Sequence, residues 1–235
     1  MERASTESDV TTCKRCPVGI ASGTPERGRC PFVPRRRGAG AVLHVAGDPV
    51  ERICFIKSGE VLVTRSSDEE RVEGTPWAVR RPGSFLGLEG LVRSDHLDSA
   101  RALGEVTLCG ASLADVGAWL DVRRTAAQVL LDAVLRSSVR ERPFRGNIDG
   151  SAVRRVAAWL VERGSGGPGQ PSRRVLAGLL GMRPETLSRA LRVLADHGVI
   201  HAGRRSIEIR DLSGLRSIAR NGRRSEAPRV HGERR

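Results

Sequence analysis

The residues best suited to chemistry in this chain are its five cysteines, three of which lie close together near the start. Thiolates bind zinc and iron–sulfur clusters, and reactive thiols act as redox switches. The segment 13–34 holds these three cysteines among prolines and glycines, with no helical or strand period. Because it can bury little apolar area, something else must order it, and a bound metal or cluster could do so. The cysteines are Cys13, Cys16, Cys30, Cys54 and Cys109.

Composition limits the class of protein. Apolar residues make up 39 % of the 235 residues, which is enough for one large domain or two modest ones. No apolar run is long enough for a membrane helix and no signal-peptide core is visible, so we expect a cytoplasmic protein with no membrane partner. An odd number of cysteines in such a chain argues against a disulfide framework. The net charge of +13 suits a polyanionic partner, although an arginine-rich proteome would also raise it.

The middle of the chain predicts an all-β domain. Glycine-bearing turns separate short apolar runs, and the turn Ser58–Glu60 between two of them indicates a hairpin. Many short strands of this kind are typical of a sandwich or jelly roll. Cys54 falls within one run, where a small buried hydrophobe is the simplest role for it. The predicted strands are 41–45, 53–56, 61–63, 77–79, 85–86, 100–103 and 106–108.

A long helix is predicted to follow, from Ala114 to Arg142, with Pro143 ending it. Apolar residues recur along it at three- and four-residue spacing. This stripe could pair with a second copy of the chain or pack on the chain's own jelly roll, and both could occur along different parts. The residues of the candidate dimer seam are Val122, Ala126, Val129 and Ala133.

The C-terminal part predicts a winged helix-turn-helix. A hinge over 143–150 and an amphipathic helix over 151–162 precede it. Ser172 can cap a short helix, Gly181 can turn the chain, and Pro184 suits the first turn of a second helix. The segment 199–209 predicts a β-hairpin wing. On the second helix Glu185, Ser188, Arg189 and Arg192 share a polar face that could reach base edges, or simply be solvated with an i,i+4 ion pair; the helical context favours DNA.

The whole pattern resembles the Crp/Fnr family of transcription regulators. Residues 46–61 resemble the first hairpin of its sensor domain, 83–91 its glycine motif, and 184–189 the start of an Fnr-type recognition helix. The resemblance covers about residues 40–215 and implies an α+β protein. The implied parts are a cysteine-bearing segment (1–38), a cyclic-nucleotide-binding-like jelly roll (39–113), a dimerisation helix (114–142), a winged helix-turn-helix (143–219) and a disordered basic tail (220–235).

The resemblance also implies partners and a mode of DNA binding. Glu185, Ser188 and Arg189 match the base-reading positions of Fnr proteins. A homodimer would then bind a palindromic site of double-stranded DNA with TTGAT-like half-sites about one helical turn apart. RNA polymerase is a further expected partner, and no enzymatic activity is expected.

What the protein senses is also suggested by resemblance. Where cyclic-nucleotide members hold ribose and phosphate, this chain has Leu88 and Asp98–Ser99, and an aspartate facing a phosphate argues against cAMP. Fnr-type oxygen sensors carry three N-terminal cysteines and one late in the jelly roll. Matching these, Cys13, Cys16, Cys30 and Cys109 would ligate a [4Fe-4S] cluster that reports oxygen or nitric oxide and controls dimerisation. The 13 residues between Cys16 and Cys30 exceed the best-known spacing, at modest entropic cost.

Other roles remain open on the residues alone. Four cysteines can hold structural zinc, and Cys13 with Cys16 can form a thiol switch. A small organic effector in the jelly roll, or no ligand at all, are further alternatives. A cupin-type metalloenzyme would need converging histidines, but no paired-histidine motif is visible and His44 is interpreted as an ordinary strand residue.

Overall fold

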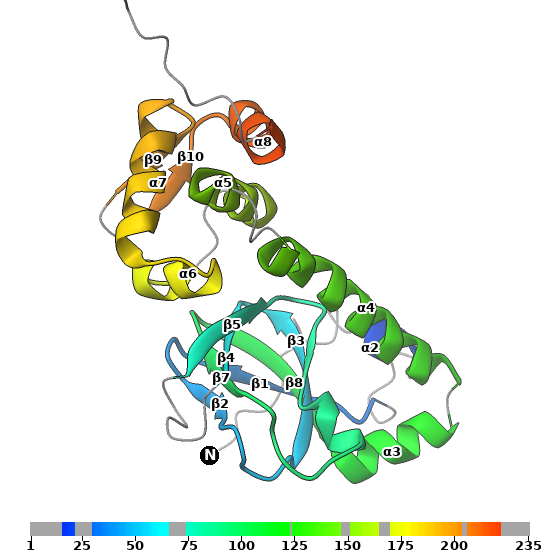
Figure 1. Ribbon diagram of the computed structural model, residues 1–235. Helices are drawn as coiled ribbons and strands as arrows, with labels where there is room; N and C mark the ends of the chain where they lie inside the picture. Colours follow the sequence, from blue (N-terminus) through cyan, green and yellow to red (C-terminus); the bar gives the residue numbers. More distant parts are fainter. Residues whose placement is uncertain are drawn as a thin grey trace, which may run out of the picture. The chain divides into compact units, whose positions relative to one another are not determined.

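The computed structural model describes residues 16–21, 30–65, 74–122, 124–146, 151–164, 170–203 and 206–221. The chain divides into two compact units, Met1–Glu141 and Arg142–Arg235, each with its own core (Figure 1). In the described part no helix is both long and apolar enough to cross a membrane.

Two four-stranded antiparallel sheets form the N-terminal unit, as the alternation of short apolar runs and glycine turns predicts. One sheet has the order β1-β8-β3-β6 and the other the order β2-β7-β4-β5. Each predicted strand is present, and the jelly roll is confirmed. The first sheet comprises β1 (Val33–Arg37), β3 (Arg52–Ser58), β6 (Phe85–Leu86) and β8 (Val106–Ser112). The second comprises β2 (Val42–His44), β4 (Val61–Arg65), β5 (Thr75–Arg80) and β7 (Ser99–Ala102).

The jelly roll begins earlier than the predicted boundary at residue 39. Strand β1 comes from the segment assigned to the cysteine region, and it pairs with β8 in a register that sets Pro34 opposite Cys109. Because β1 is an edge strand with one neighbour, it tolerates a proline that cannot donate a ladder hydrogen bond. The cysteine-bearing segment is thus tied directly into the sheet.

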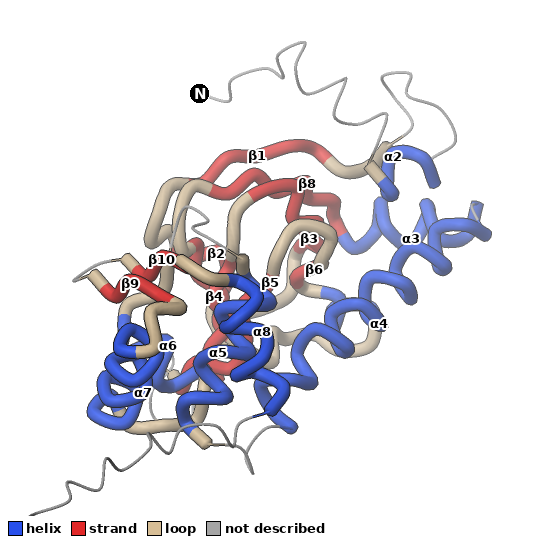
Figure 2. The backbone as a smooth tube through the Cα atoms, turned by 90° about the horizontal axis from the view of Figure 1, so that it is seen from above, coloured by secondary structure: helices blue, strands red, loops and turns tan. Residues whose placement is uncertain are grey.

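The predicted single helix over 114–142 is in fact two helices, α3 (Leu113–Val122) and α4 (Arg124–Gly146). Val116 and Trp119 of α3 enter the same apolar core as Ala126 and Ala133 of α4. The chain changes direction between the two helices (Figure 1), and both lie along the same side of the jelly roll in Figure 2. The prediction that Pro143 ends the helix is wrong, because a proline removes one backbone hydrogen bond without preventing the flanking turns from remaining helical.

The C-terminal unit packs four helices and a hairpin around one core of leucines and valines. The predicted capping of α6 by Ser172 is confirmed, with Val175 N donating to Ser172 Oγ at 3.3 Å. The last helix, α8, was not predicted. It packs against α5 and carries the buried Leu215. At its start Asp211 Oδ1 accepts a hydrogen bond from Ser213 N at 2.9 Å. The elements are α5 (Ala152–Arg163), α6 (Arg173–Leu179), α7 (Pro184–Asp196), β9 (Ile200–Ala202), β10 (Ile207–Ile209) and α8 (Leu212–Asn221).

Candidate functional site

Helix α7 presents a polar face outward, as the sequence predicts. Pro184 occupies its first turn, and four apolar residues of the opposite face are buried in the C-terminal core. The buried residues are Leu187, Ala190, Leu191 and Leu194. The predicted DNA-contacting residues Glu185, Ser188, Arg189 and Arg192 are all exposed on the other face. This arrangement holds α7 firmly by one side and leaves donors and acceptors free to meet the edges of bases.

The turn between α6 and α7 is held by backbone and by one arginine. Gly181 takes a φ of 58°, which is left-handed backbone that suits glycine, and Met182 N donates to Ala177 O at 2.9 Å. Arg155 of α5 donates from Nη1 to Leu180 O at 3.0 Å. These contacts fix the angle between the two helices, which is what a helix-turn-helix requires.

The wing is fixed by a residue that sequence analysis missed. The side-chain amide of Gln170 brackets Ile207 of β10, with Nε2 donating to the carbonyl and Oε1 accepting from the N–H, each at 3.0 Å. Arg173 adds a hydrogen bond from Nη2 to Gly203 O at 2.8 Å. Gln170 directly follows a glycine-rich loop, where nothing in a single sequence distinguishes a clamp from a solvated amide.

Two of the predicted cluster ligands share one core. Cys16 and Cys109 are both buried in the apolar cluster that includes Val18, Phe32 and Ala126. Cys109 lies on β8, opposite Phe55 of β3. Cys30 is exposed, and Cys13 lies outside the described residues.

The three described cysteines of the predicted ligand set do not converge as ligands of a single ion. Among described residues, the one group of three or more potential ligands with atoms within 4.8 Å of one another is His44, Glu89 and His96. The spacing of Cys16, Cys30 and Cys109 in this arrangement is therefore wider than the donor set of a closed zinc site.

Cys54 lies elsewhere, beside the cluster formed by Ile56, Val61 and their neighbours. Burial raises the pKa of its thiol above the ordinary value of 9.0, although Arg52, Arg35 and Arg37 act to lower that pKa. A neutral, mostly buried thiol matches the predicted role as a small hydrophobe.

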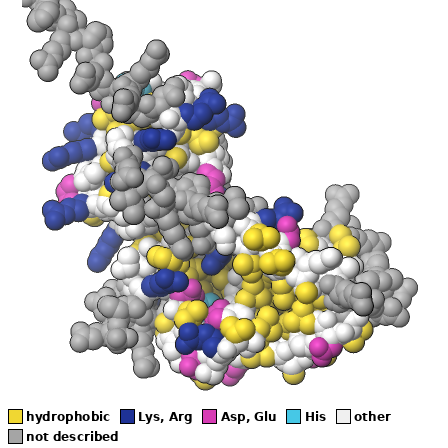
Figure 3. All heavy atoms as spheres, turned by 45° about the vertical axis from the view of Figure 1, so that its right-hand side comes forward, with side chains coloured by type: hydrophobic (Ala, Val, Ile, Leu, Met, Phe, Trp, Pro, Cys, Tyr) yellow, Lys and Arg dark blue, Asp and Glu magenta, His cyan; other side chains and the backbone are white. Residues whose placement is uncertain are grey.

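The predicted dimer seam needs correction. Ala126 and Ala133 are 0 % and 5 % exposed, and Val129 packs on the same core, so all three face their own jelly roll. A side chain already covered by its own domain cannot also pack on a second copy. Only Val122 of the four is exposed, at 76 %. Among its described side chains, α4 exposes the large apolar residues Leu131, Val134 and Leu135, and hydrophobic side chains gather on this face in Figure 3.

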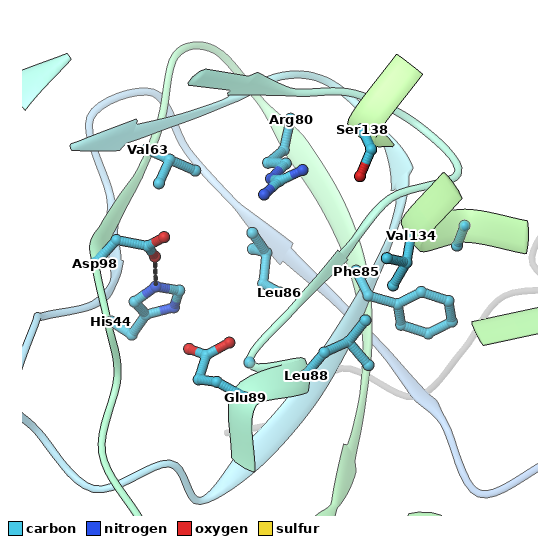
Figure 4. A pocket seen from close by; sticks show the side chains of 12 residues that line it. His44, Val63, Arg80, Phe85, Leu86, Leu88, Glu89, Asp98, Val134 and Ser138 are labelled. Atoms are coloured by element: carbon cyan, nitrogen blue, oxygen red, sulfur yellow. Dashed lines mark hydrogen bonds and ion pairs between the residues drawn. The ribbon is translucent and has the colours of Figure 1, made fainter. Parts of the chain in front are cut away.

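A cavity of about 200 Å³ lies between the jelly roll and α4 (Figure 4). Leu88 and Asp98, the positions expected to replace ribose and phosphate contacts, both line it. Val134 and Ser138 of α4 close one side. Asp98 Oδ1 pairs with His44 Nε2 at 3.2 Å, so an acidic group lines the cavity.

Sequence analysis also missed the convergence of two histidines, of which His44 lines this cavity. The His44 and His96 rings stack with centroids 3.9 Å apart and planes 4° from parallel. They come from β2 and from the loop before β7, and only the closure of the roll brings these segments together.

Comparisons with known proteins identify both units. A family model for the cyclic nucleotide-binding domain matches residues 34–121, and one for the Crp-like helix-turn-helix domain matches residues 154–218. The two matches have the order found here and together span well over half of the chain. The chain belongs to the Crp/Fnr family of transcription regulators. As a member, it is a DNA-binding regulator with a sensor domain followed by a helix-turn-helix domain.

Individual relatives agree with this assignment. The transcriptional regulatory protein btr of Bordetella pertussis is 22 % identical, covering 92 % of this chain and 96 % of that protein. Among solved structures, FixK2 from Bradyrhizobium japonicum has a TM-score of 0.64 at 23 % identity, covering 79 % of this chain and 96 % of its own. A Crp/Fnr-family regulator from Thermus thermophilus has a TM-score of 0.61 at 22 % identity, covering 81 % and 100 %. At such identities the structures establish the shared fold.

Proposed function

We propose that this regulator binds palindromic double-stranded DNA as a homodimer, with Glu185, Ser188, Arg189 and Arg192 contacting the bases. The supporting observation is the exposure of all four on α7 while its other face is buried. Two copies would pair through the exposed apolar face of α4, which includes Leu131 and Leu135. A two-fold dimer matches a two-fold site, and RNA polymerase is the expected further partner.

We also propose that DNA binding responds to oxygen or nitric oxide through a [4Fe-4S] cluster on Cys13, Cys16, Cys30 and Cys109. The observation that carries this proposal is the burial of Cys16 and Cys109, which are far apart in sequence, in one core with α4. In a cubane each thiolate binds its own iron, so its sulfurs stand farther apart than the ligands of one ion. The wide separation of the three described cysteines argues against a closed zinc site and does not conflict with a cluster.

The chain's own contacts give such a site a route to the dimer face. Val18 and Ala21 of α2 (Pro17–Ala21) are buried beside Ala126 of α4. Thr125 Oγ1, at the start of α4, donates to Ala21 O at 3.3 Å. When bound, the cluster would supply a centre that oxygen or nitric oxide degrades. Release of Cys16 would then free α2 from α4, and a few kcal/mol of lost dimer stability suffices to change DNA occupancy.

Anaerobic reconstitution with iron and sulfide tests this proposal. We expect a broad absorption at the blue end of the visible spectrum that bleaches in air, together with loss of operator binding. Cys109→Ser should lose both the chromophore and the response to air. Cys54→Ser is the matched control, since Cys54 lies outside the proposed ligand set, and it should keep both. A wild-type protein that binds DNA equally with and without the chromophore would refute the proposal.

The cavity against α4 favours a second candidate, a small effector. Because Val134 and Ser138 line it, a molecule bound there would contact the helix that carries the dimer face. Calorimetric titration with candidate effectors distinguishes the two, since an effector-only regulator should respond identically in the Cys109→Ser variant.

A further inference from the structure

Four ionisable side chains meet at one corner of the jelly roll, and three of them, His44, Glu89 and Asp98, line the cavity in Figure 4. His96 Nδ1 lies 2.8 Å from Glu89 Oε1, and His44 Nε2 lies 3.2 Å from Asp98 Oδ1. Their side chains are largely covered, with exposed fractions of 9 % for His44, 7 % for His96, 17 % for Glu89 and 21 % for Asp98. Buried groups of this kind are costly unless each has a partner of complementary charge.

The backbone around the cluster is cross-linked by hydrogen bonds, so the side chains are held in place by rigid segments. Gly47 N donates to His96 O and His96 N donates to Asp48 O, each at 2.9 Å. Ala46 N donates to Ser99 Oγ at 2.9 Å. These bonds fix the backbone that carries the ligands, which a metal site needs, and leave the imidazole rings able to rotate.

Gly87 adds a close approach to this corner. Its φ is 77°, and a Cβ at that position would lie 2.5 Å from the backbone oxygen of Arg52 and 3.5 Å, an ordinary contact, from Cε1 of His96. Glu89 follows two residues later in the 3-10 helix η1 (Leu88–Leu91). The sharp turn at Gly87 thus allows the carboxylate of Glu89 to reach His96.

The spacing of the ligand atoms matches the needs of one ion. One donor atom from each of His44, Glu89 and His96 lies within 4.8 Å of the others. Ligands bound at about 2.1 Å with angles between 90° and 110° stand about 3.0–3.4 Å apart. The pair His96 Nδ1–Glu89 Oε1, at 2.8 Å, is already near that separation, and the third ligand atom lies within 4.8 Å of both. Two imidazoles and one carboxylate are the donors that zinc and iron(II) favour.

Charge points the same way. Glu89 and Asp98 place two carboxylates in a partly covered site, where a divalent cation would balance their charge. Arg80 lines the cavity on one side. Arg35, Arg37, Arg52, Asp48 and Glu51 line a second cavity, of about 420 Å³, on the side of His96. These surrounding side chains include both positively and negatively charged groups.

We infer that His44, Glu89 and His96 bind a single divalent transition-metal ion, with Asp98 orienting His44. In Figure 4 the His44 ring lies between the carboxylates of Asp98 and Glu89. Asp98 on one ring nitrogen fixes the tautomer and leaves the other for the ion, an arrangement common around metal-binding histidines. The nitrogen lone pairs lie in the ring planes, so at least one ring must turn out of the stack on binding. Cys54 lines the second cavity together with His44 and His96, but Cys16, Cys30 and Cys109 line neither cavity, and the inference does not depend on the proposed cluster.

Cobalt(II) titration of the full-length, metal-free protein under reducing conditions tests the inference. Cobalt held by nitrogen and oxygen shows d–d bands without the strong near-ultraviolet charge transfer of thiolate ligation, so the two classes of site are read separately. We expect one equivalent of the nitrogen–oxygen type, retained in Cys109→Ser. Zinc bound there should show X-ray absorption distances of about 2.0–2.1 Å with no sulfur shell at about 2.3 Å.

Matched variants locate the site. His96→Gln should weaken this equivalent about a hundredfold or more, and Asp98→Asn about ten- to a hundredfold, as loss of an orienting partner typically does. Glu89→Gln preserves the size and shape of the side chain, so a loss of metal binding in this variant is not a result of misfolding. Circular dichroism and the thermal midpoint check that the fold is intact. The control is His201→Gln, an exposed histidine of the wing. Cobalt bound only through thiolates, or an equivalent unchanged in both Glu89→Gln and His96→Gln, would overturn the inference.

Discussion

Leu135→Ala tests which face of α4 pairs two copies of this regulator. Leu135 is 56 % exposed in the single chain. Complete burial of a leucine is worth about 1.5–3 kcal/mol, so covering what remains exposed contributes about 1–1.5 kcal/mol. A two-fold dimer presents the residue twice, which makes the loss about 2–3 kcal/mol. The dimer dissociation constant should rise about 30- to 150-fold.

Sedimentation velocity over a concentration series, carried out without oxygen, measures this constant. Leu97→Ala is the matched control, because Leu97 is 52 % exposed but lies outside α3 and α4. Operator affinity should fall in parallel with dimerisation for Leu135→Ala and stay unchanged for Leu97→Ala. If Leu135→Ala dimerised as tightly as the wild type, or if both variants weakened it equally, the assignment of the dimer face would be wrong.

Three further predictions concern single residues. Leu191→Ala, at 1 % exposure in the C-terminal core, should destabilise that unit by about 2–5 kcal/mol, measured by urea unfolding. Arg189→Ala should relax base preference at one position of each half-site by about 1–3 kcal/mol, measured by binding to mutated operators, without changing the thermal midpoint. Arg216→Ala, at another exposed arginine, should leave the base preference unchanged. Burial raises the pKa of Cys54 in the folded state, so the free energy of unfolding should fall as pH rises from about 9 through that pKa. Cys54→Ala should remove this part of the alkaline loss, as measured by unfolding at a series of pH values.

Local patterns in the sequence were enough to predict most of the fold. Strand alternation located all the strands of the jelly roll from β2 to β8, and capping and turn residues located α6, α7 and the wing. The exposed face of α7 followed from its period, because a helix with four buried positions at that spacing leaves the others outside.

The errors have one physical origin, since periodicity shows that a stripe is apolar without showing what covers it. Ala126 and Ala133 were assigned to a dimer seam, yet the jelly roll covers them. Convergence of distant residues is equally hidden, as with His44 and His96 or with Gln170 and Ile207, because it depends on how the strands close.

Helix α4 has three faces with different surroundings. A ligand that acts on either covered face could therefore control the same property, the pairing of two copies. Ala126 and Ala133 pack in the core that contains Cys16 and Cys109. Val134 and Ser138 line the cavity beside Glu89 and Asp98. Leu131 and Leu135 are exposed, and we propose that they pair two copies. A ligand on either covered face that favours one position of α4 changes the affinity of the two copies for each other. By linkage, dimerisation changes the affinity for that ligand by the same free energy.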